Sequence, residues 1–266
     1  MRLLFCILLV AAERKNQMKN FIKYLLQKIL GFDNYLFLFS LYIIKTLKRN
    51  KKERDFLYFL DLIKNEGVIF DVGANIGIMS YHICKSFPNS SIYAFEPIPS
   101  NIKAFKRVIK HYDIDNINVI ETAVGNVNGS VEMVMPVIRS VKLQGLSHVI
   151  IDKSHAVNEG DIFKSEIVKL DSFYTGNNIQ QPLVAIKIDV ENYEFFVLDG
   201  AKEIIEKYRP LIYCELWENQ NREDCLKLIA NFNYSAKVIY KNKLCNFDIE
   251  VHKTQNFFFI PNTQTE

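Results

Sequence analysis

The sequence lacks several features that would place it in common classes of protein. Its five cysteines include no Cys-x-x-Cys pair, which argues against a zinc site of that kind and against a thioredoxin-like motif. The net charge of +3 is too small to indicate a nucleic-acid partner, which would need Lys and Arg clustered on one face. No repeat or low-complexity segment is present. The odd number of cysteines, several of them in apolar runs, favours reduced thiols in a cytoplasmic protein.

The sequence also lacks an uninterrupted apolar run of the about 20 residues that a membrane-spanning helix needs. Residues 2–12 form a short apolar run after a single Arg, but no clear A-x-A cleavage site follows. The run meets Glu13, Arg14 and Lys15 directly. Met18 is therefore an alternative start, which would exclude residues 1–17 from the native protein.

Residues 1–65 are expected to form a helical extension in front of an α/β domain that covers residues 66–266. Residues 21–47 are apolar with a helical pattern, and we expect them to form a cap that packs on this domain. An acceptor lid, a dimer surface and membrane-surface association through residues 21–54 stay open as alternatives. The last of these rests on a basic run made of Lys45, Lys48, Arg49, Lys51, Lys52 and Arg54.

The most informative stretch is residues 68–77, where an apolar run ends at Asp71 and a glycine-containing loop leads into a helical pattern. Gly73 and Gly77 are present, but Asn75 takes the place of the middle glycine in the G-x-G-x-x-G fingerprint of dinucleotide sites. A carboxylate at Asp71 would repel a pyrophosphate and would suit a cationic ligand. S-adenosylmethionine (SAM) is such a ligand, whereas a turn cap is the ordinary alternative for Asp71.

A second acidic residue follows the next predicted strand. Glu96 ends the apolar run of residues 92–95, and Pro97 stops the strand because it has no N–H for the ladder. Glu96 lies about 20 residues after the glycine loop, the spacing at which an acid reaches the hydroxyls of a bound ribose. A solvated strand end is the ordinary alternative, but the two acids in this order favour a nucleoside site.

Strand and helix patterns alternate through the rest of the chain, which predicts a mainly parallel sheet with right-handed crossovers. Residues 137–160 show little periodicity, and we interpret them as an insertion that faces an acceptor. His148 and His155 lie within it and are more ordinary as surface residues than as bases. Further strands are expected at residues 118–123, 131–135, 166–170, 183–189, 211–216, 234–240 and 256–260.

Charged residues gather at the ends of two later strands. Lys187, Asp189 and Glu191 alternate, so in an extended strand they would point the same way. Lys187 and Asp189 would satisfy each other as a buried ion pair. Because α/β folds bind ligands at the carboxyl ends of their strands, Asp189 is also expected to lie near a bound cofactor. Glu215 and Trp217 end the next strand, where Trp217 would stack on a sugar ring or fill the core.

Five motifs run in order from residue 68 to residue 215: Asp71–Gly77, Phe95–Pro97, Lys187–Glu191, Leu198–Ala201 and Pro210–Glu215. Together they resemble the FkbM family of SAM-dependent methyltransferases. The resemblance implies a Rossmann-like class I methyltransferase fold, a mainly parallel seven-stranded sheet with helices on both faces and the last strand antiparallel. It also implies a SAM cofactor and O-methylation of a sugar, glycan or natural-product hydroxyl.

The resemblance assigns roles to residues of this chain. Cofactor binding is expected of Asp71, Gly73, Asn75, Gly77, Glu96, Pro97, Thr122, Ala123 and Asp189, with Thr122 and Ala123 beside the adenine. A sugar hydroxyl is a poor nucleophile and needs a base, for which Asp189 is the first candidate and Glu191 and Glu215 the others. Asn192 and Tyr193 depart from the family's usual Gly and His, which leaves the acceptor less defined than SAM.

Two further functions and one further cofactor remain open. The chain could be a SAM-binding module without turnover, or a nicotinamide-dependent oxidoreductase, although the glycine spacing disfavours the latter. Carboxylates such as Asp189, Glu191 and Glu215 would suit Mg²⁺, but the family motif does not require a metal and we expect none. The acceptor, the choice between oxygen and nitrogen methylation and the oligomeric state are not determined by these motifs.

Overall fold

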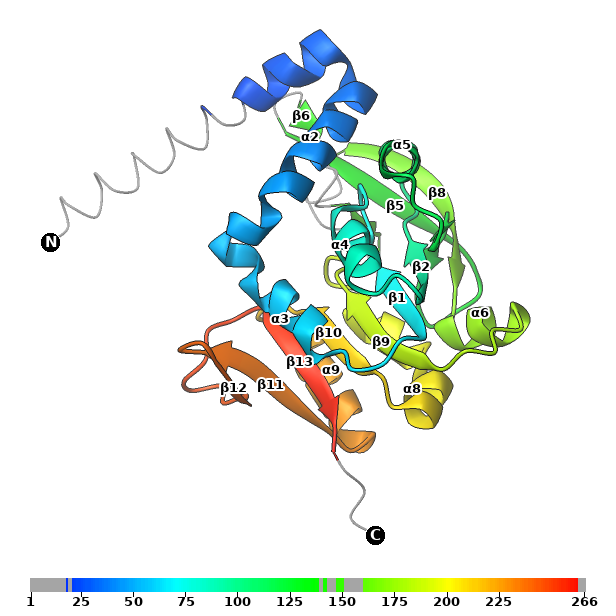
Figure 1. The fold of residues 1–266 in the computed structure, drawn as a ribbon, viewed down its shortest axis with the longest axis vertical. Helices are drawn as coiled ribbons and strands as arrows, with labels where there is room; N and C mark the ends of the chain where they lie inside the picture. The colour runs from blue at the N-terminus through cyan, green and yellow to red at the C-terminus, as the bar shows by residue number, and fades with distance from the viewer. Residues whose placement is uncertain (1–17, 19–20, 139–140, 143–146, 151–159, 263–266) are drawn as a thin grey trace, which may run out of the picture.

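The computed structural model describes residues 18, 21–138, 141–142, 147–150 and 160–262. The main sheet has eight strands in the order β12-β11-β13-β10-β9-β1-β2-β3 (Figure 1). β10, β9, β1, β2 and β3 pair in parallel, whereas β13 runs antiparallel to both β10 and β11. The strands are β1 Val68–Val72, β2 Ser91–Phe95, β3 Ile117–Ile120, β9 Leu183–Ile188, β10 Leu211–Glu215, β11 Tyr234–Tyr240, β12 Lys243–Asn246 and β13 Asn256–Pro261.

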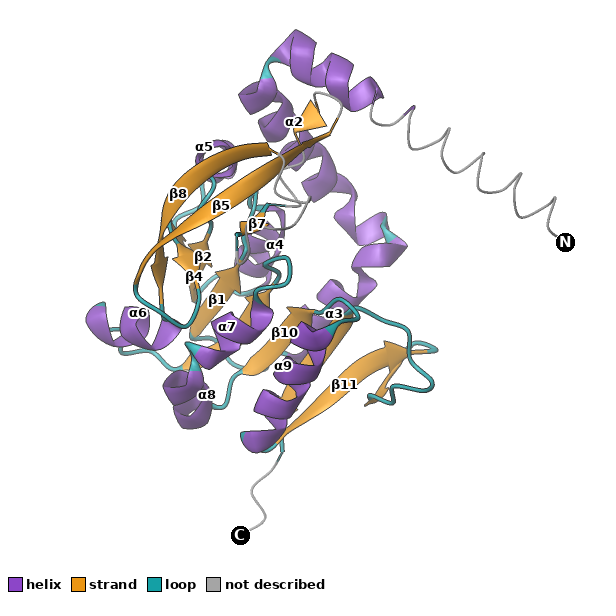
Figure 2. Cartoon of the chain, turned by 180° about the vertical axis from the view of Figure 1, so that it is seen from behind, coloured by secondary structure: helices purple, strands orange, loops and turns teal. Residues whose placement is uncertain are grey.

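Helices cover both faces of this sheet (Figures 1 and 2). Neighbouring residues of β1 show why: Ile69 packs into the apolar cluster on one face and Phe70 into the cluster on the other, because side chains alternate along a strand. One face carries α3 Arg54–Leu62, α4 Ile78–Ser86 and α5 Pro99–Tyr112. The other face carries α6 Leu170–Gly176, α7 Glu194–Asp199, α8 Lys202–Tyr208 and α9 Gln220–Asn231.

The sheet differs from the expected one by a strand. Seven strands were expected, and the structure has eight, because β12 pairs antiparallel with β11 at the edge. The two strands are joined at Lys241 and Asn242, which both have positive φ, 50° and 63°. Such a turn matches the twist of a hairpin, but Lys is not a residue that signals it in a sequence. The α/β class with helices on both faces and an antiparallel last strand is as expected.

A second, smaller sheet stands beside the main one. The strand expected at residues 118–123 ends at Ile120, and Ala123 instead begins a strand of this second sheet. Parts of the irregular segment 137–160 also join it, while residues 139–140, 143–146 and 151–159, with His155, lie outside the described residues. The strands of the second sheet are β4 Ala123–Val124, β5 Gly129–Ile138, β6 Val141–Lys142, β7 His148–Val149 and β8 Gly160–Val168.

The N-terminal segment forms two helices rather than a single run. Phe21–Leu30 and α2 (Phe32–Thr46) meet at a bend of 117°, where Gly31 has a φ of 74°. Two short 3₁₀ turns, η1 (Leu47–Arg49) and η2 (Lys51–Glu53), then lead into α3. In the described part of the chain no single helix has the length and apolar character to cross a membrane, although the bent pair does when taken together.

α2 is fixed to the domain through its inner side. Tyr35 and Leu36 pack with Ile76 and Ala104 in one apolar cluster. The Ser40 hydroxyl donates to the backbone carbonyl of Ile76 at 3.3 Å. This helix therefore caps the loop that follows β1.

A charged pair lies inside the main sheet. Lys187 of β9 is the register partner of Asp71 of β1, and their side chains are 3 % and 0 % exposed. The Lys187 ammonium lies 3.1 Å from Asp71 and 3.6 Å from Asp189, and it donates to the Gly73 carbonyl at 2.9 Å. Burial alone lowers the pKa of Lys187, but the two carboxylates outweigh it and the pKa is raised, so the lysine stays charged.

Removing this lysine is expected to destabilise the fold. In Lys187→Met the buried Asp71 carboxylate loses its counter-charge, and breaking a buried pair from one side costs about 3–5 kcal/mol. Urea unfolding of the variant measures this loss. Lys202→Met is the matched control, because Lys202 pairs with Asp199 near the surface and such pairs contribute about 1 kcal/mol or less.

The double variant Asp71→Asn/Lys187→Met tests the cause of the loss. It removes both charges and keeps an acceptor for the Ser80 hydroxyl, which donates to Asp71 at 2.5 Å. We expect it to be more stable than Lys187→Met alone. If Lys187→Met lost no more stability than Lys202→Met, the buried ion pair would not have the stabilising role assigned to it.

Candidate active site

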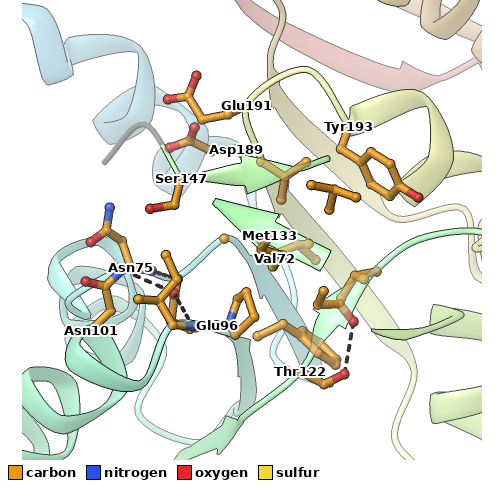
Figure 3. A pocket seen from close by; sticks show the side chains of 18 residues that line it. Val72, Asn75, Glu96, Asn101, Thr122, Met133, Ser147, Asp189, Glu191 and Tyr193 are labelled. Carbon is orange, nitrogen blue, oxygen red and sulfur yellow. Dashed lines mark hydrogen bonds between the residues drawn. The ribbon is translucent and has the colours of Figure 1, made fainter. Parts of the chain in front are cut away.

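A pocket, partly open to solvent, lies at the carboxyl ends of β1, β2 and β9 (Figure 3). Open α/β sheets bind ligands at this edge. The second sheet closes one side with Met133 and Val149. The residues that the three strand ends contribute are Val72, Gly73, Asn75, Phe95, Glu96, Pro97, Ile98, Asp189, Val190 and Glu191.

The two glycines of the loop after β1 are required by close contacts. Gly73 has a φ of 78°, and a Cβ there would lie 1.8 Å from the Asp189 carbonyl oxygen. Gly77 has a φ of 80°, and a Cβ there would lie 2.1 Å from the Phe105 ring. Asn75 between them also has a positive φ, 52°, which Asn tolerates better than most residues. The loop can therefore pass close to β9 and α5.

Glu96 holds this loop and the start of α5. One carboxylate oxygen accepts from the backbone N–H of Asn75 at 2.8 Å, and the other accepts from the N–H of Ile98 at 2.9 Å and the Asn101 amide at 3.1 Å. The side chain is buried, and burial raises the pKa of Glu96 to about 7 in spite of these hydrogen bonds. Figure 3 shows Glu96, Asn75 and Asn101 together on one side of the pocket.

Two amide oxygens beside Glu96 lack donors. Within the described residues, the buried Oδ1 atoms of Asn75 and Asn101 have no hydrogen-bond partner, and both residues line the pocket. Unpaired buried acceptors are costly, so donors on a ligand would stabilise them. Asn101 was not predicted from the sequence, because its place in the first turn of α5 beside Glu96 depends on how the helix packs.

Carboxyl groups crowd the other side of the pocket. Asp189 and Glu191 line it, and Glu215 lies behind them at the end of β10. Burial, then repulsion by Asp189, raises the pKa of Glu191 to about 8 and that of Glu215 to about 7. Glu53 was not predicted from the sequence; it comes from η2, and burial followed by repulsion from Asp189 raises its pKa as well. A cation in this part of the pocket would relieve the repulsion.

A polar groove adjoins the acidic side. Trp217 lines it with 41 % of its surface exposed, and its side chain lowers the pKa of Glu191 of the first pocket, which opposes the effect of burial. Asn219 donates to the Asn192 side chain at 2.6 Å, and Asn192 has a φ of 66°, so the turn survives without the family's usual glycine. The groove is lined by Asn192, Trp217, Glu218, Asn219, Arg222, Lys253, Thr254 and Gln255.

The structure brings most of the predicted site residues together, and it places three elsewhere. Asp71 lies buried behind the loop with Lys187, so its carboxylate supports the loop and does not line the pocket. Gly77 packs on Phe105, and Glu215 lies outside the lining. Those that line it are Gly73, Asn75, Glu96, Pro97, Thr122, Ala123, Asp189 and Glu191.

Lys187, Asp189 and Glu191 do not form the single row expected of a strand. β9 ends at Ile188, and Glu191 has a positive φ of 50°, so the chain turns beyond the strand. Ser147, Met133, Val149 and Tyr193 also line the pocket without having been assigned to it. No group of three or more His, Cys, Asp or Glu side chains is arranged to hold a metal ion in the part of the chain that the structure describes.

Comparisons with known proteins agree with this geometry. "Methyltransferase 1" of Beauveria bassiana is 22% identical over 149 residues, which cover 52% of this chain and 60% of that protein. "Methyltransferase sdnD" of Sordaria araneosa is 23% identical over 157 residues, which cover 59% of this chain and 54% of that protein. This chain thus matches only about half to three fifths of the length of these relatives.

Among solved structures, the methyltransferase FkbM from Methylobacillus flagellatus has a similar fold. Its TM-score is 0.51 at 15% identity, and the match covers 92% of this chain and 60% of that one. The family model described as "Methyltransferase FkbM domain" matches residues 71–256, which include both glycines of the loop, Glu96, Asp189 and Trp217. Because the match covers well over half of the sequence, this chain belongs to the FkbM family of methyltransferases.

Proposed function

We propose that this protein is a SAM-dependent methyltransferase that methylates a hydroxyl group of a sugar, a glycan or a natural product. The observation that carries the proposal is the pocket at the strand ends. One side of it is rich in carboxyl groups, and the other holds two amide oxygens that lack donors among the described residues. SAM fits both sides, because it carries ammonium and sulfonium charges and ribose hydroxyl donors.

The residues that would hold SAM follow from their positions. Glu96, Asn75 and Asn101 offer acceptors for the ribose hydroxyls, and Thr122 and Ala123 lie at the side where the adenine is expected. Asp189 would face the cationic end. When bound, SAM would supply a methyl group made electrophilic by its positively charged sulfur.

The chain's own contribution to transfer would be positioning and proton removal. A hydroxyl oxygen is a poor nucleophile, and a base within hydrogen-bond reach of it contributes about 10²–10⁴-fold. Asp189 is our first candidate, because its carboxylate lines the pocket and is 40 % exposed, so an acceptor can reach it. Glu191 and Glu215 have pKa values raised to about 8 and about 7, which suits groups that exchange a proton near neutral pH.

The groove beside Trp217 supports an acceptor of the sugar type. A sugar ring has an apolar C–H face that packs on an aromatic ring and hydroxyls that bond to planar polar groups. Trp217 is partly exposed, and Asn219, Arg222 and Gln255 surround it. Its effect on the pKa of Glu191 indicates that the groove adjoins the acidic side of the pocket, where the methyl group would be transferred.

Glu96→Ala is expected to weaken SAM binding. Hydrogen bonds to a charged group contribute about 1.5–3 kcal/mol, so the Kd should rise at least about tenfold in a calorimetric titration. Glu121→Ala is the matched control, because Glu121 follows the neighbouring strand β3 but pairs with Lys106 at the surface. A thermal melt verifies that the Glu96 variant is folded. An unchanged Kd in the folded variant, or tighter binding of NADH than of SAM to the wild type, would count against the proposal.

Asp189→Asn is expected to impair transfer more than binding. The amide keeps the shape of the side chain but accepts a proton poorly, so kcat at saturating SAM should fall by about 10²-fold or more. The rise in the Kd of SAM, which loses one charge at its cationic end, should be smaller. The assay follows transfer of a labelled methyl group to a panel of simple glycosides. Glu218→Gln provides a comparison with a nearby carboxyl group of the groove. Full activity in Asp189→Asn would exclude it as the base, and a wild type that binds SAM but methylates no acceptor would indicate a module without turnover.

SAM affinity is expected to increase as the pH rises from about 6 to about 8. Burial raises the pKa of Glu191 to about 8 and the pKa values of Glu215 and Glu194 to about 7, so the free protein holds protons there at neutral pH. A cation favours the ionised forms, and binding then releases protons. Calorimetry in buffers of different ionisation enthalpy measures that release.

The stability of the free protein should change in the opposite direction. These carboxyl groups bind protons more tightly folded than unfolded, so the free energy of unfolding falls as the pH rises from about 4.5, their ordinary pKa, towards 8. Glu191→Gln should weaken the pH dependence of both the SAM affinity and the free energy of unfolding. A SAM affinity that is constant or falls over this range would contradict the sign of the linkage.

A further inference from the structure

The helix Phe21–Leu30 turns its apolar side towards solvent. Phe21 is 58 % exposed and Ile29 75 % exposed. Lys23, Tyr24 and Gln27 on the opposite side are half-buried. A helix that packs on a domain normally shows the reverse arrangement. The exposed apolar residues are Phe21, Ile22, Leu25, Leu26 and Ile29, which at 100° per residue fall within an arc of about 140°.

The side of this helix that faces the protein is mostly polar, with Leu30 at its end packed against the apolar cluster of α2. The Gln27 side chain donates to the backbone carbonyl of Lys142 in β6 at 3.4 Å. The Lys142 ammonium lies 5.4 Å from the centre of the Phe32 ring. In Figures 1 and 2 the helix lies beside β6, at the edge of the molecule away from the main sheet. Its apolar side is therefore left without a partner among the described residues.

α2, in contrast, packs against the domain. Its buried residues Tyr35, Leu36, Ser40 and Ile44 face the domain. Inserting α2 into a bilayer would expose the apolar cluster that it forms with Ile76 and Ala104. α2 therefore stays packed on the domain, although Leu38 and Tyr42 are exposed, and so the pair would lie on a membrane rather than cross it.

The charge of the extension identifies the chemistry of its partner. Residues 21–52 hold seven basic residues and one acidic residue, a net charge of +6, whereas the whole chain carries +3. The remaining chain therefore sums to −3. The single acid, Asp33, is already paired with Lys103. The basic residues are Lys23, Lys28, Lys45, Lys48, Arg49, Lys51 and Lys52.

We propose that the Phe21–Leu30 helix lies in the surface of a membrane that contains anionic lipids. Its apolar side would enter the boundary between headgroups and acyl chains, and the basic residues of the extension would contact lipid phosphates and carboxylates. A second copy of this chain on the apolar side of this helix would bring the same positive charge, and the two copies would repel each other. Residues 1–17 carry three basic residues and one acid, so they too would bring positive charge. Anionic lipid is the occupant that complements both the apolar surface and the charge.

Sedimentation of the full chain with vesicles tests this proposal. The wild type should bind phosphatidylcholine vesicles that contain phosphatidylserine, and it should bind pure phosphatidylcholine vesicles much more weakly. Phe21→Glu/Ile29→Glu should weaken binding to the anionic vesicles by at least about tenfold, since it places two charges on the inserted side. The matched control is Ile162→Glu/Val251→Glu, which makes the same charge change at two exposed apolar residues elsewhere.

Each outcome bears on the assignment. Strong binding by the control and weak binding by Phe21→Glu/Ile29→Glu support it, provided that both variants bind SAM as the wild type does. Equal loss in the two double variants would overturn it, as would a wild type that ignores anionic vesicles. A dimer that becomes a monomer in Phe21→Glu/Ile29→Glu, with vesicle binding unchanged, would assign the face to a second copy. A chain starting at Met18 that no longer binds would assign the lipid contact to residues 1–17.

Discussion

Lys187 occupies the centre of the parallel sheet, where an ammonium group can exist only if several partners surround it. It contacts Asp71 on the neighbouring strand, Asp189 beyond the end of its own strand, and the carbonyl of Gly73. Gly73 and Asp189 line the pocket, and Asp71 lies buried behind them. The buried charge thus connects the packing of the sheet to the geometry of the site, because the loop after β1 and the turn after β9 depend on one ammonium.

The pocket itself brings together groups that would be unfavourable without a ligand. Two amide oxygens lack donors among the described residues, and burial raises the pKa values of Glu96 and Glu191. The pKa of Glu215, which lies behind the lining, is raised as well. Perturbed carboxyl groups and unpaired acceptors in a concave site are the marks of a binding site rather than of a stable core. Membership of a methyltransferase family agrees with a cationic donor here, although the matched relatives and this chain share only part of their lengths.

The N-terminal extension contacts the domain near the pocket and exposes an apolar helix at its other end. Its turn η2 carries Glu53, which Asp189 of the pocket repels, and α2 caps the loop that follows β1. Its first helix carries an apolar side that the described residues do not cover. A segment that interacts with both the site and a surface would fix how the pocket is oriented relative to that surface. This arrangement depends on Gly31, whose positive φ permits the bend between the two helices.

The sequence alone determined the local features of this protein. Gly73, Gly77, Glu96 and Asp189 could be located because a strand followed by a tight loop leaves a pattern in adjacent residues. Only the tertiary structure decided the roles that depend on distant contacts, such as the burial of Asp71 beneath the loop, the approach of Glu53 and Asn101, and the eighth strand. It also revealed that the first helix is apolar on its outer side. Periodicity shows that a helix has two sides, but which side faces solvent is set by what the rest of the chain packs against it.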